Sequence, residues 1–396
     1  MKRLSPTVIF LGLASFFTDM SSEMIYPLLP VFLSTALGAG ALALGVIEGV
    51  AESTASILKV ASGLWTDRTR RRKPLMLAGY GLAGLVRPLI GLAGAWPFVL
   101  AMRFLDRVGK GLRTSPRDAL IADVTDPDMR GTAYGVHRAM DHAGAVVGPL
   151  VAAGLLTLFA WLRPDAGVTQ YLRWVFLLAA VPAVAVMVIL VFGVKEPPAH
   201  ADAESPRVDF KALWSGTDRN FKTFLLAVLV FTLGNSTDAF LLLRLKSAGI
   251  SAGGVAVLWA LHHVVKMALT YAGGRLADRM GRRTMIVLGW MVYAVVYLAF
   301  AMVSSKAGLI AIFLAYGIYF GLCEPAEKAL ISDLAPKPLR GTAFGCYHGV
   351  IGLAALPASL LFGLLWQNFG MTTAFATGAG LAAMASMMLM ATKSVR

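Results

Sequence analysis

The feature that most constrains this chain is a short basic segment that lies between two long apolar runs and occurs twice, about 210 residues apart. The first copy covers residues 63–73 and the second covers 274–283. A pattern that returns at a fixed spacing indicates a duplicated structural unit. The flanking apolar runs reach about 20 residues, the length that an α-helix needs to cross ~30 Å of hydrocarbon. We therefore predict an all-α integral membrane protein made of two related halves.

The composition supports a membrane protein. Hydrophobic residues make up 57% of the 396 residues, charged residues only 15%, and the mean hydropathy is +0.70, so the chain has more apolar surface than a soluble domain could bury. A membrane β-barrel would instead show alternating segments of ~10 residues, which the sequence lacks. Twelve transmembrane helices are predicted, at 7–33, 41–65, 75–93, 96–115, 131–160, 169–193, 221–244, 251–277, 284–303, 306–328, 341–367 and 371–392.

The duplication can be followed residue by residue. Gly111, Asp123 and Arg130 return as Gly321, Asp333 and Arg340 at a constant offset of 210 residues. In the first helix of each half, Glu23 aligns with Asp238. Parallel repeats of six spans are the architecture of two-bundle secondary transporters. We predict an N-terminal six-helix bundle at 1–194, a cytoplasmic linker at 195–220 that is rich in Pro and charged residues, and a C-terminal six-helix bundle at 221–396.

The net charge of +14 is explained by where the basic residues lie relative to the membrane. Lys and Arg gather in alternate loops and at both termini, and basic loops face the cytoplasm. This predicts a multi-pass protein of the cell (inner) membrane with both termini cytoplasmic. The basic excess is thus explained by topology, and no nucleic-acid partner is expected.

Four sequence features resemble those of one transporter family. The Gly-x-x-x-Asp-Arg-x-Gly-Arg-Arg pattern is complete at Gly274 to Arg283, and its first copy has Arg70 in place of the inner Gly; it resembles the loop signature of the major facilitator superfamily. Arg107-x-x-Lys110-Gly in span four resembles a further motif of that family. Gly148-Pro149 in span five resembles the motif of its proton-coupled drug antiporters, and the segment that starts at Asp19 resembles a bacterial and archaeal branch.

The resemblance implies two six-helix bundles related by a pseudo-twofold axis, with a latch that holds them together on the cytoplasmic side and opens during alternating access. The residues expected in this gating are Gly63, Asp67, Arg68, Gly274, Asp278, Arg279 and Arg282 of the two loops, with Gly148 and Pro149 of span five, which by resemblance pack against span eight. The alternatives are an arginine cluster that only sets topology and ordinary small-residue packing in span five.

Ionisable residues at membrane depth point to the transport site. A charge at the centre of a span costs about 2.5–3.5 kcal/mol on insertion scales, so such residues usually face a cavity or pair with one another. Asp19 and Glu23 are four residues apart and share one helical face, where close carboxylates favour holding a proton. Either of them is the predicted proton carrier, with Arg107 or Arg103 as its partner; the alternative is a static buried salt bridge between spans one and four.

By resemblance, spans one, four, seven and ten line the central cavity. The expected proton-coupling and cavity residues are Asp19, Glu23, Arg103, Asp106, Arg107, Asp141, Asp238, Glu324 and Glu327. The prediction is a proton-coupled secondary transporter that exports a small organic solute or drug, with membrane lipids around it, no cofactor, no enzymatic activity and, by resemblance, a monomeric state. The substrate, the direction and the choice between symport and antiport stay open.

The alternative function is transport of a transition-metal ion or a metal chelate. His263 and Met267 are four residues apart in span eight and resemble a motif of copper-importing members of the superfamily. The Met pair that those members carry in span seven is missing here. A membrane-embedded enzyme would need a metal-ligand set or a nucleophile beside a base, and the sequence shows neither.

Overall fold

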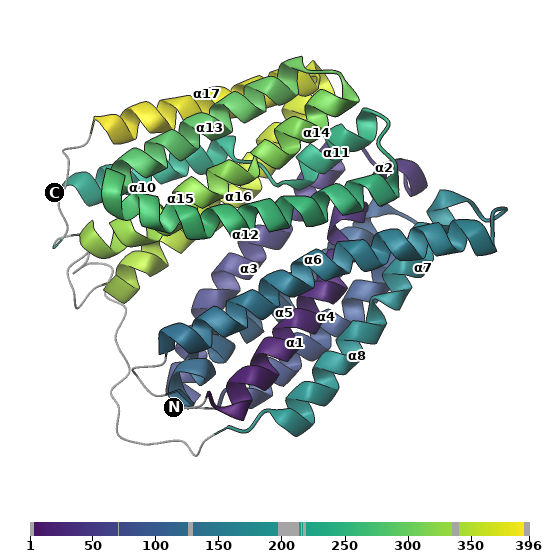
Figure 1. Ribbon diagram of the computed structural model, residues 1–396, viewed down its shortest axis with the longest axis horizontal. Helices are drawn as coiled ribbons and strands as arrows, with labels where there is room; N and C mark the ends of the chain where they lie inside the picture. The colour runs from purple at the N-terminus through teal and green to yellow at the C-terminus, as the bar shows by residue number, and fades with distance from the viewer. Residues whose placement is uncertain are drawn as a thin grey trace. The chain divides into compact units, whose positions relative to one another are not determined.

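A computed structural model describes residues 4–69, 71–125, 130–196, 214, 216, 219–334 and 340–391 (Figure 1). Helices make up all the regular secondary structure of these residues, and no strand occurs among them. The predicted all-α class is confirmed.

The first half builds its six predicted spans from the following elements. They are α1 (Pro6–Glu23), η1 (Tyr26–Leu28) and α2 (Leu29–Ala36), then α3 (Ala41–Thr69), α4 (Lys73–Leu89) with η2 (Ile90–Leu92), α5 (Trp96–Asp123), α6 (Arg130–Leu162), and α7 (Gly167–Leu178) with α8 (Ala180–Val188) and the π-helical turn η4 (Ile189–Gly193).

The second half repeats this series. It contains α10 (Arg219–Gly234), α11 (Ala239–Ser247), α12 (Ala252–Met280), α13 (Arg282–Met302), α14 (Lys306–Ala315), α15 (Gly317–Leu334), α16 (Arg340–Phe369) and α17 (Met371–Met390).

The first span of each half is interrupted, whereas the sequence pattern predicts it to be continuous. In the first half α1 ends at Glu23, and Pro27 and Pro30 follow within one turn of each other. Proline lacks the backbone N–H that would continue the helical hydrogen bonds. In the second half α10 ends at Gly234, and Asp238 is the residue that precedes α11. Both carboxylates that the repeat aligns therefore lie at a break in their span.

Eleven helices among the described residues are long and apolar enough to cross a membrane. The remaining predicted span lies in α5, which has 28 residues and so extends about 42 Å at 1.5 Å per residue. Its middle part carries Arg103, Asp106, Arg107 and Lys110, which lower its hydropathy. This helix is long enough to span, and its charges mark it as the polar helix of the first half.

The described chain forms two compact units. Unit 1 consists of Met1–Ala39, Thr54–Ser205 and Ser251–Ala260, and unit 2 of Gly40–Ser53, Pro206–Ile250 and Leu261–Arg396. Within unit 1, α1 packs against α6 and α8, and α4 packs against α5. Within unit 2, α13 packs between α15 and α17. The predicted domain limits stay a prediction, and residues 197–213 of the predicted linker lie outside the described residues.

The interiors of the two units are built differently. A cluster in unit 1 joins α1, α4 and α5 mainly through aliphatic side chains such as Val8, Leu11 and Ile121. Unit 2 is packed with aromatic rings that are at most 7% exposed: Phe231, Trp290, Tyr293, Tyr297, Tyr316, Tyr319, Phe362 and Phe375. Ring pairs contribute about 0.5–1.5 kcal/mol each beyond the burial of their area.

Candidate transport site

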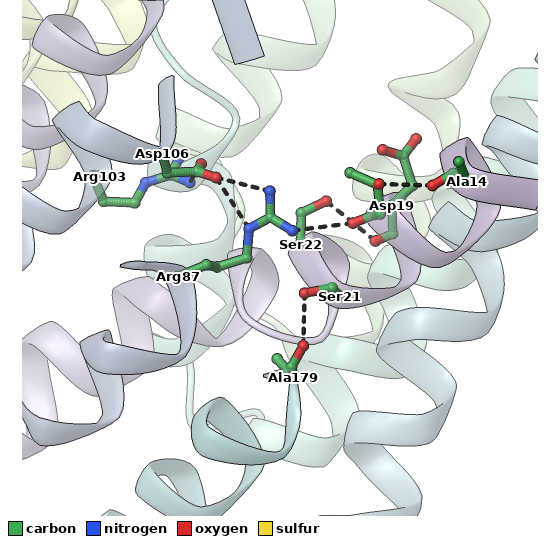
Figure 2. Close-up of polar contacts among 9 residues, drawn as sticks. Ala14, Asp19, Ser21, Ser22, Arg87, Arg103, Asp106 and Ala179 are labelled. Carbon is green, nitrogen blue, oxygen red and sulfur yellow. Dashed lines mark hydrogen bonds and ion pairs between the residues drawn. The ribbon is translucent and has the colours of Figure 1, made fainter. Parts of the chain in front are cut away.

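A buried ion pair joins α4 and α5 in unit 1. The Arg87 guanidinium donates to Asp106 Oδ1 from Nη2 at 2.7 Å and from Nε at 3.1 Å, and Arg103 Nη1 lies 3.5 Å from Asp106 Oδ2. Arg87 Nη1 also donates to the Thr18 carbonyl of α1 at 3.1 Å, so Figure 2 shows Arg87 between Asp106 and α1. All three charged side chains are at most 4% exposed. One carboxylate is thus held by two guanidiniums in the interior.

Glu23, at the end of α1, has an aromatic partner. Its Oε2 accepts a hydrogen bond from Trp259 Nε1 of α12 at 2.7 Å. The Trp259 ring lies 5.2 Å from the Tyr26 ring, and the Arg103 guanidinium lies 5.7 Å from that same ring centroid. The expected arginine partner, Arg103, is therefore near Glu23 but pairs with Asp106 on its own helix. Arg107 is buried on α5 as well.

Asp19 meets a second carboxyl group. Its side chain lies within hydrogen-bonding reach of the side chain of Asp141 of α6. Asp141 Oδ1 also accepts from Ser15 Oγ at 2.5 Å, and Arg138 Nη1 lies 3.4 Å from Asp141 Oδ2. Ionised carboxylates only accept hydrogen bonds, so two of them can be bonded to each other only when one carries a proton. The contact between Asp19 and Asp141 is therefore compatible with one shared proton, and the predicted proton-coupling role of these residues stays a prediction.

The carboxylates of unit 2 are held by neutral donors. Asp238 Oδ1 accepts from the Tyr316 hydroxyl at 2.8 Å. Glu327 of α15 accepts from Trp290 Nε1 at 3.1 Å and from the Tyr347 hydroxyl. Glu324, one turn away from Glu327, instead forms a partly exposed pair with Lys328 at 3.1 Å.

Of the seven gating residues predicted in the two loops, the structure describes the side chain of one, Arg282. Gly63, Asp67, Arg68, Gly274, Asp278 and Arg279 lie within α3 and α12, at positions whose side chains fall outside the described part of the chain. Their role in a latch stays a prediction. Arg282 is described: it donates to the Ala329 carbonyl at 2.9 Å and pairs with Asp333.

This pairing of Arg282 is repeated in the first half. Arg72 pairs with Asp123, and both residues lie 210 positions before Arg282 and Asp333. Each half thus joins the start of its third span to the end of its fourth by the same ion pair. In unit 1, Glu196 also accepts from the backbone N–H groups of Arg72 and Lys73.

Gly148 and Pro149 lie where α6 packs closely on α1. A Cβ added at Gly148 would lie 2.6 Å from the Met20 carbonyl oxygen, and one at Gly144 would overlap the Phe16 carbonyl. The small residues therefore allow the backbones of α1 and α6 to approach each other, and they bring Asp141 to Asp19. The expected packing of Gly148 against span eight stays a prediction.

The residues behind the metal alternative, His263 and Met267, both lie on α12, and Met267 is 45% exposed. Among the residues that the structure describes, no group of three or more His, Cys, Asp or Glu side chains is arranged to hold a metal ion. The geometry adds nothing to this alternative.

Several partners in the site were not predicted from the sequence. Arg87, Ser15, Trp259, Trp290 and Tyr347 hold the carboxylates, yet only Arg87 carries a signal in the sequence, a charge within an apolar span before a proline. The aromatic and hydroxyl partners are ordinary residues of apolar helices. The rotation and depth of neighbouring helices decide which of them reach a carboxylate.

The chain resembles known transporters in sequence and in fold. The sequence pattern of the Major Facilitator Superfamily matches residues 11–262 and 223–395. An uncharacterized MFS-type transporter of Methanocaldococcus jannaschii is 34% identical over 372 residues, covering 92% of this chain and 90% of that protein. The multidrug resistance protein MdtH of Salmonella newport is 24% identical over 330 residues, covering 81% of this chain and 77% of that protein.

Solved structures share the fold at low sequence identity. The nucleoside transporter NupG superposes with a TM-score of 0.80 at 10% identity, covering 97% of this chain and 98% of that protein. A bacterial homologue of the human lysosomal transporter Spinster, in its inward-facing and unoccupied conformation, gives a TM-score of 0.74 at 16% identity, covering 97% and 94%. With the doubled family match and the twelve-span helical architecture, these likenesses show that the chain is a multi-pass membrane transporter of the Major Facilitator Superfamily.

Proposed function

We propose that this transporter couples the export of a small organic solute to the movement of protons, by alternating access in the cell membrane. The observation that supports it most is the close approach of the carboxyl groups of Asp19 and Asp141, which can form a hydrogen bond with each other only when one of them carries a proton. A proton binding site between two helices couples to transport when the two conformations of the carrier differ in their affinity for the proton. The multidrug resistance relative favours an organic solute and export.

The surroundings of this pair fit a site that changes its charge. Losing the proton places two carboxylates side by side, and their repulsion favours separation of α1 from α6. Arg138 on α6 is one nearby cation that can offset the new charge. Glu23 lies one turn from Asp19, at the end of α1. A change of charge at Asp19 therefore also changes the electrostatic potential at Glu23. Release of the proton thereby acts on the contact between α1 and α6.

The proposal includes a topology and a gate. Both termini face the cytoplasm, the protein acts as a monomer, and the segments around Asp67 and Asp278 form the cytoplasmic latch. Support comes from the basic loops of the sequence and from the ion pairs Arg72 to Asp123 and Arg282 to Asp333, which occupy equivalent places in the two halves. Cysteine accessibility from either side of a vesicle tests this topology.

The test uses purified protein in liposomes with an imposed pH gradient. Drug-like solutes that raise the melting temperature of the protein are chosen first, since a ligand of the folded state stabilises it. Gradient-driven transport of such a solute is expected to fall by about fivefold or more in Asp141→Asn. The matched control is Asp165→Asn, because the Asp165 side chain is 73% exposed and pairs with Arg163 at the surface. Equal gradient-driven transport in wild type and Asp141→Asn would refute the role of the pair.

A further inference from the structure

Arg113 on α5 is a buried cation without an acidic partner. The residue is 6% exposed, and its Nε and Nη1 atoms lie in the interior and form no hydrogen bond with any described residue. Arginine keeps its positive charge in proteins and can only donate hydrogen bonds. Burying a charge without a partner costs more free energy than most single contacts in a protein return. A group that carries negative charge is therefore expected beside this guanidinium.

An aromatic side chain of α4 accompanies the guanidinium. Arg113 Cζ lies 4.4 Å from the centroid of the Tyr80 ring, within the range of a cation–π contact. Tyr80 is 3% exposed, and its buried hydroxyl forms no hydrogen bond with any described residue either. The ring attracts the cation but carries no net charge. Two buried groups on neighbouring helices thus have hydrogen bonds to donate to an acceptor.

The charged side chains around Arg113 do not provide this acceptor. Arg87 of α4 and Arg117, one turn along α5, are cations with carboxylate partners of their own. Asp19 of α1 is the acidic group that acts on Arg113 electrostatically. No ion pair joins the two among the described residues, and the side chain of Asp19 approaches that of Asp141 instead. The acceptor is therefore sought outside the chain.

The repeat shows that the packing of these helices does not require a cation. Arg113 aligns with Cys323 and Gly79 aligns with Gly289, both at the offset of 210 residues. The same contact recurs, because a Cβ on Gly79 would lie 3.0 Å from Arg113 Cβ and one on Gly289 would overlap Cys323 Sγ. Cys323 is neutral and donates to the Ile286 carbonyl at 3.6 Å. The charge of Arg113 thus points to a ligand rather than to packing.

The space beside Arg113 limits the size of that ligand. A Cβ on Gly109, one turn before Arg113, would lie 2.5 Å from the Gly79 carbonyl oxygen and 3.0 Å from Ala83 Cβ, so α4 and α5 are in backbone contact here. Interiors packed this closely have few voids larger than a water molecule. Such packing excludes an organic solute. Water can accept the hydrogen bonds without neutralising the charge, whereas a small inorganic anion does both.

We propose that Arg113 and the Tyr80 hydroxyl bind a monatomic anion such as chloride inside unit 1. The guanidinium supplies the charge and N–H donors, and the hydroxyl supplies a further donor from the neighbouring helix. The bound anion links α4 to α5 and stabilises the first half of the protein. This inference is independent of the proposed function, because a resident anion neither crosses the membrane nor moves with a proton.

The test compares thermal unfolding of the full-length purified protein in sodium bromide and in sodium gluconate at equal concentration. Gluconate is an anion too large for the site. The wild type is expected to melt about 3 °C higher in bromide, because a ligand of the folded state stabilises it. Arg113→Gln is expected to melt at one temperature in both salts. The matched control is Arg117→Gln, which removes a guanidinium that has a carboxylate partner and should keep the bromide shift.

A second variant and a measurement on the wild type guard against misfolding of Arg113→Gln. Tyr80→Phe keeps the charge and the ring and removes only the hydroxyl, so it should weaken the apparent affinity for bromide by about fivefold. In wild-type crystals soaked in bromide, anomalous scattering should place a bromide ion within hydrogen-bonding distance of Arg113 Nε.

Three results would overturn the inference. Equal melting temperatures of the wild type in the two salts would mean that the folded protein binds no halide. A bromide shift that Arg113→Gln retains in full would be a general effect of salt. An anomalous map without bromide beside Arg113 would show that Asp19 balances this charge from a distance. Transport driven by a pH gradient is measured separately, so each of these results leaves the proposed function as it stands.

Discussion

Asp106 in the first half and two carboxylates in the second half, Asp238 and Glu327, are held in opposite ways. In unit 1, Asp106 is held by the guanidiniums of Arg87 and Arg103. In unit 2, Asp238 and Glu327 are held by the hydroxyl and indole groups of Tyr316, Trp290 and Tyr347. An ion pair with a guanidinium favours the charged form of a carboxylate more strongly than a hydrogen bond from a neutral donor does.

The comparison teaches that duplication has preserved the helices and one ion pair, but not the chemistry of the interior. Arg72 with Asp123 and Arg282 with Asp333 are the same pair in both halves. In contrast, Arg117 became Glu327, and His137 became Tyr347, or the reverse. The repeat thus specifies architecture, and the differences between its copies are the places to look for function.

The largest effect is expected at Asp106, where a substitution tests whether the ion pairs with Arg87 and Arg103 stabilise the fold. Asp106→Asn leaves two buried guanidiniums without their counter-charge, and breaking a buried pair in this way costs about 3–5 kcal/mol. Thermal unfolding of the purified protein should show a strong loss of stability, or expression should fail. The exposed pair of Arg163 and Asp165 is the control, and Asp165→Asn should cost no more than about 1 kcal/mol. A mild effect of Asp106→Asn would remove the contrast between the two halves.

The next effect tests the close contact of α1 and α6. Gly148→Leu forces a side chain against the Met20 carbonyl and should cost about 1–3 kcal/mol through overpacking. Gly154→Leu is the matched control on the same helix, because no atom lies within 4 Å of the place its Cβ would take. Melting temperatures of the two variants make the comparison. Equal stability would mean that α6 does not need its small residues at this contact.

A smaller loss of stability is expected when the repeated ion pair is broken, and its size can be compared between the two halves. Arg72 has a side chain that is 10% exposed, whereas that of Arg282 is 32% exposed. Arg72→Ala should therefore cost about 1.5 kcal/mol, as expected for a hydrogen bond to a charged group, and Arg282→Ala about 0.2–1 kcal/mol. Added salt should weaken the Arg282 contribution more than that of Arg72. The reverse order would show that burial does not govern the strength of this pair.

The smallest effect concerns a neutral donor of unit 2. Tyr316→Phe removes the hydroxyl that donates to Asp238 and keeps the ring in its stack, so it should cost about 0.5–1.5 kcal/mol. Thr223→Ser, at an exposed hydroxyl bonded within α10, is the control and should be close to neutral. A loss as large as that of Asp106→Asn would show that neutral donors also lock a carboxylate in place.

The site was partly predictable for a physical reason. Hydrophobic periodicity indicates where helices run, and charges inside apolar runs stand out because burying them is costly. Asp19, Glu23, Asp106 and Glu327 were predicted in this way, and their role in transport stays a prediction. The breaks after Glu23 and before Asp238 were missed, because a short interruption does not lower the hydropathy of a span.

The sequence by itself determined the twelve spans, the two related halves and the membership of a transporter family. These properties follow from run length and from identities at a fixed offset, which do not depend on how helices rotate. Only the tertiary structure decided that Asp19 meets Asp141, that Glu23 meets Trp259 from 236 residues away, and that Arg87 takes Asp106. Whether two side chains on different helices form a hydrogen bond depends on the rotation and depth of both helices, to within the length of that bond. A periodic pattern along one helix contains no information about the rotation or depth of its neighbour.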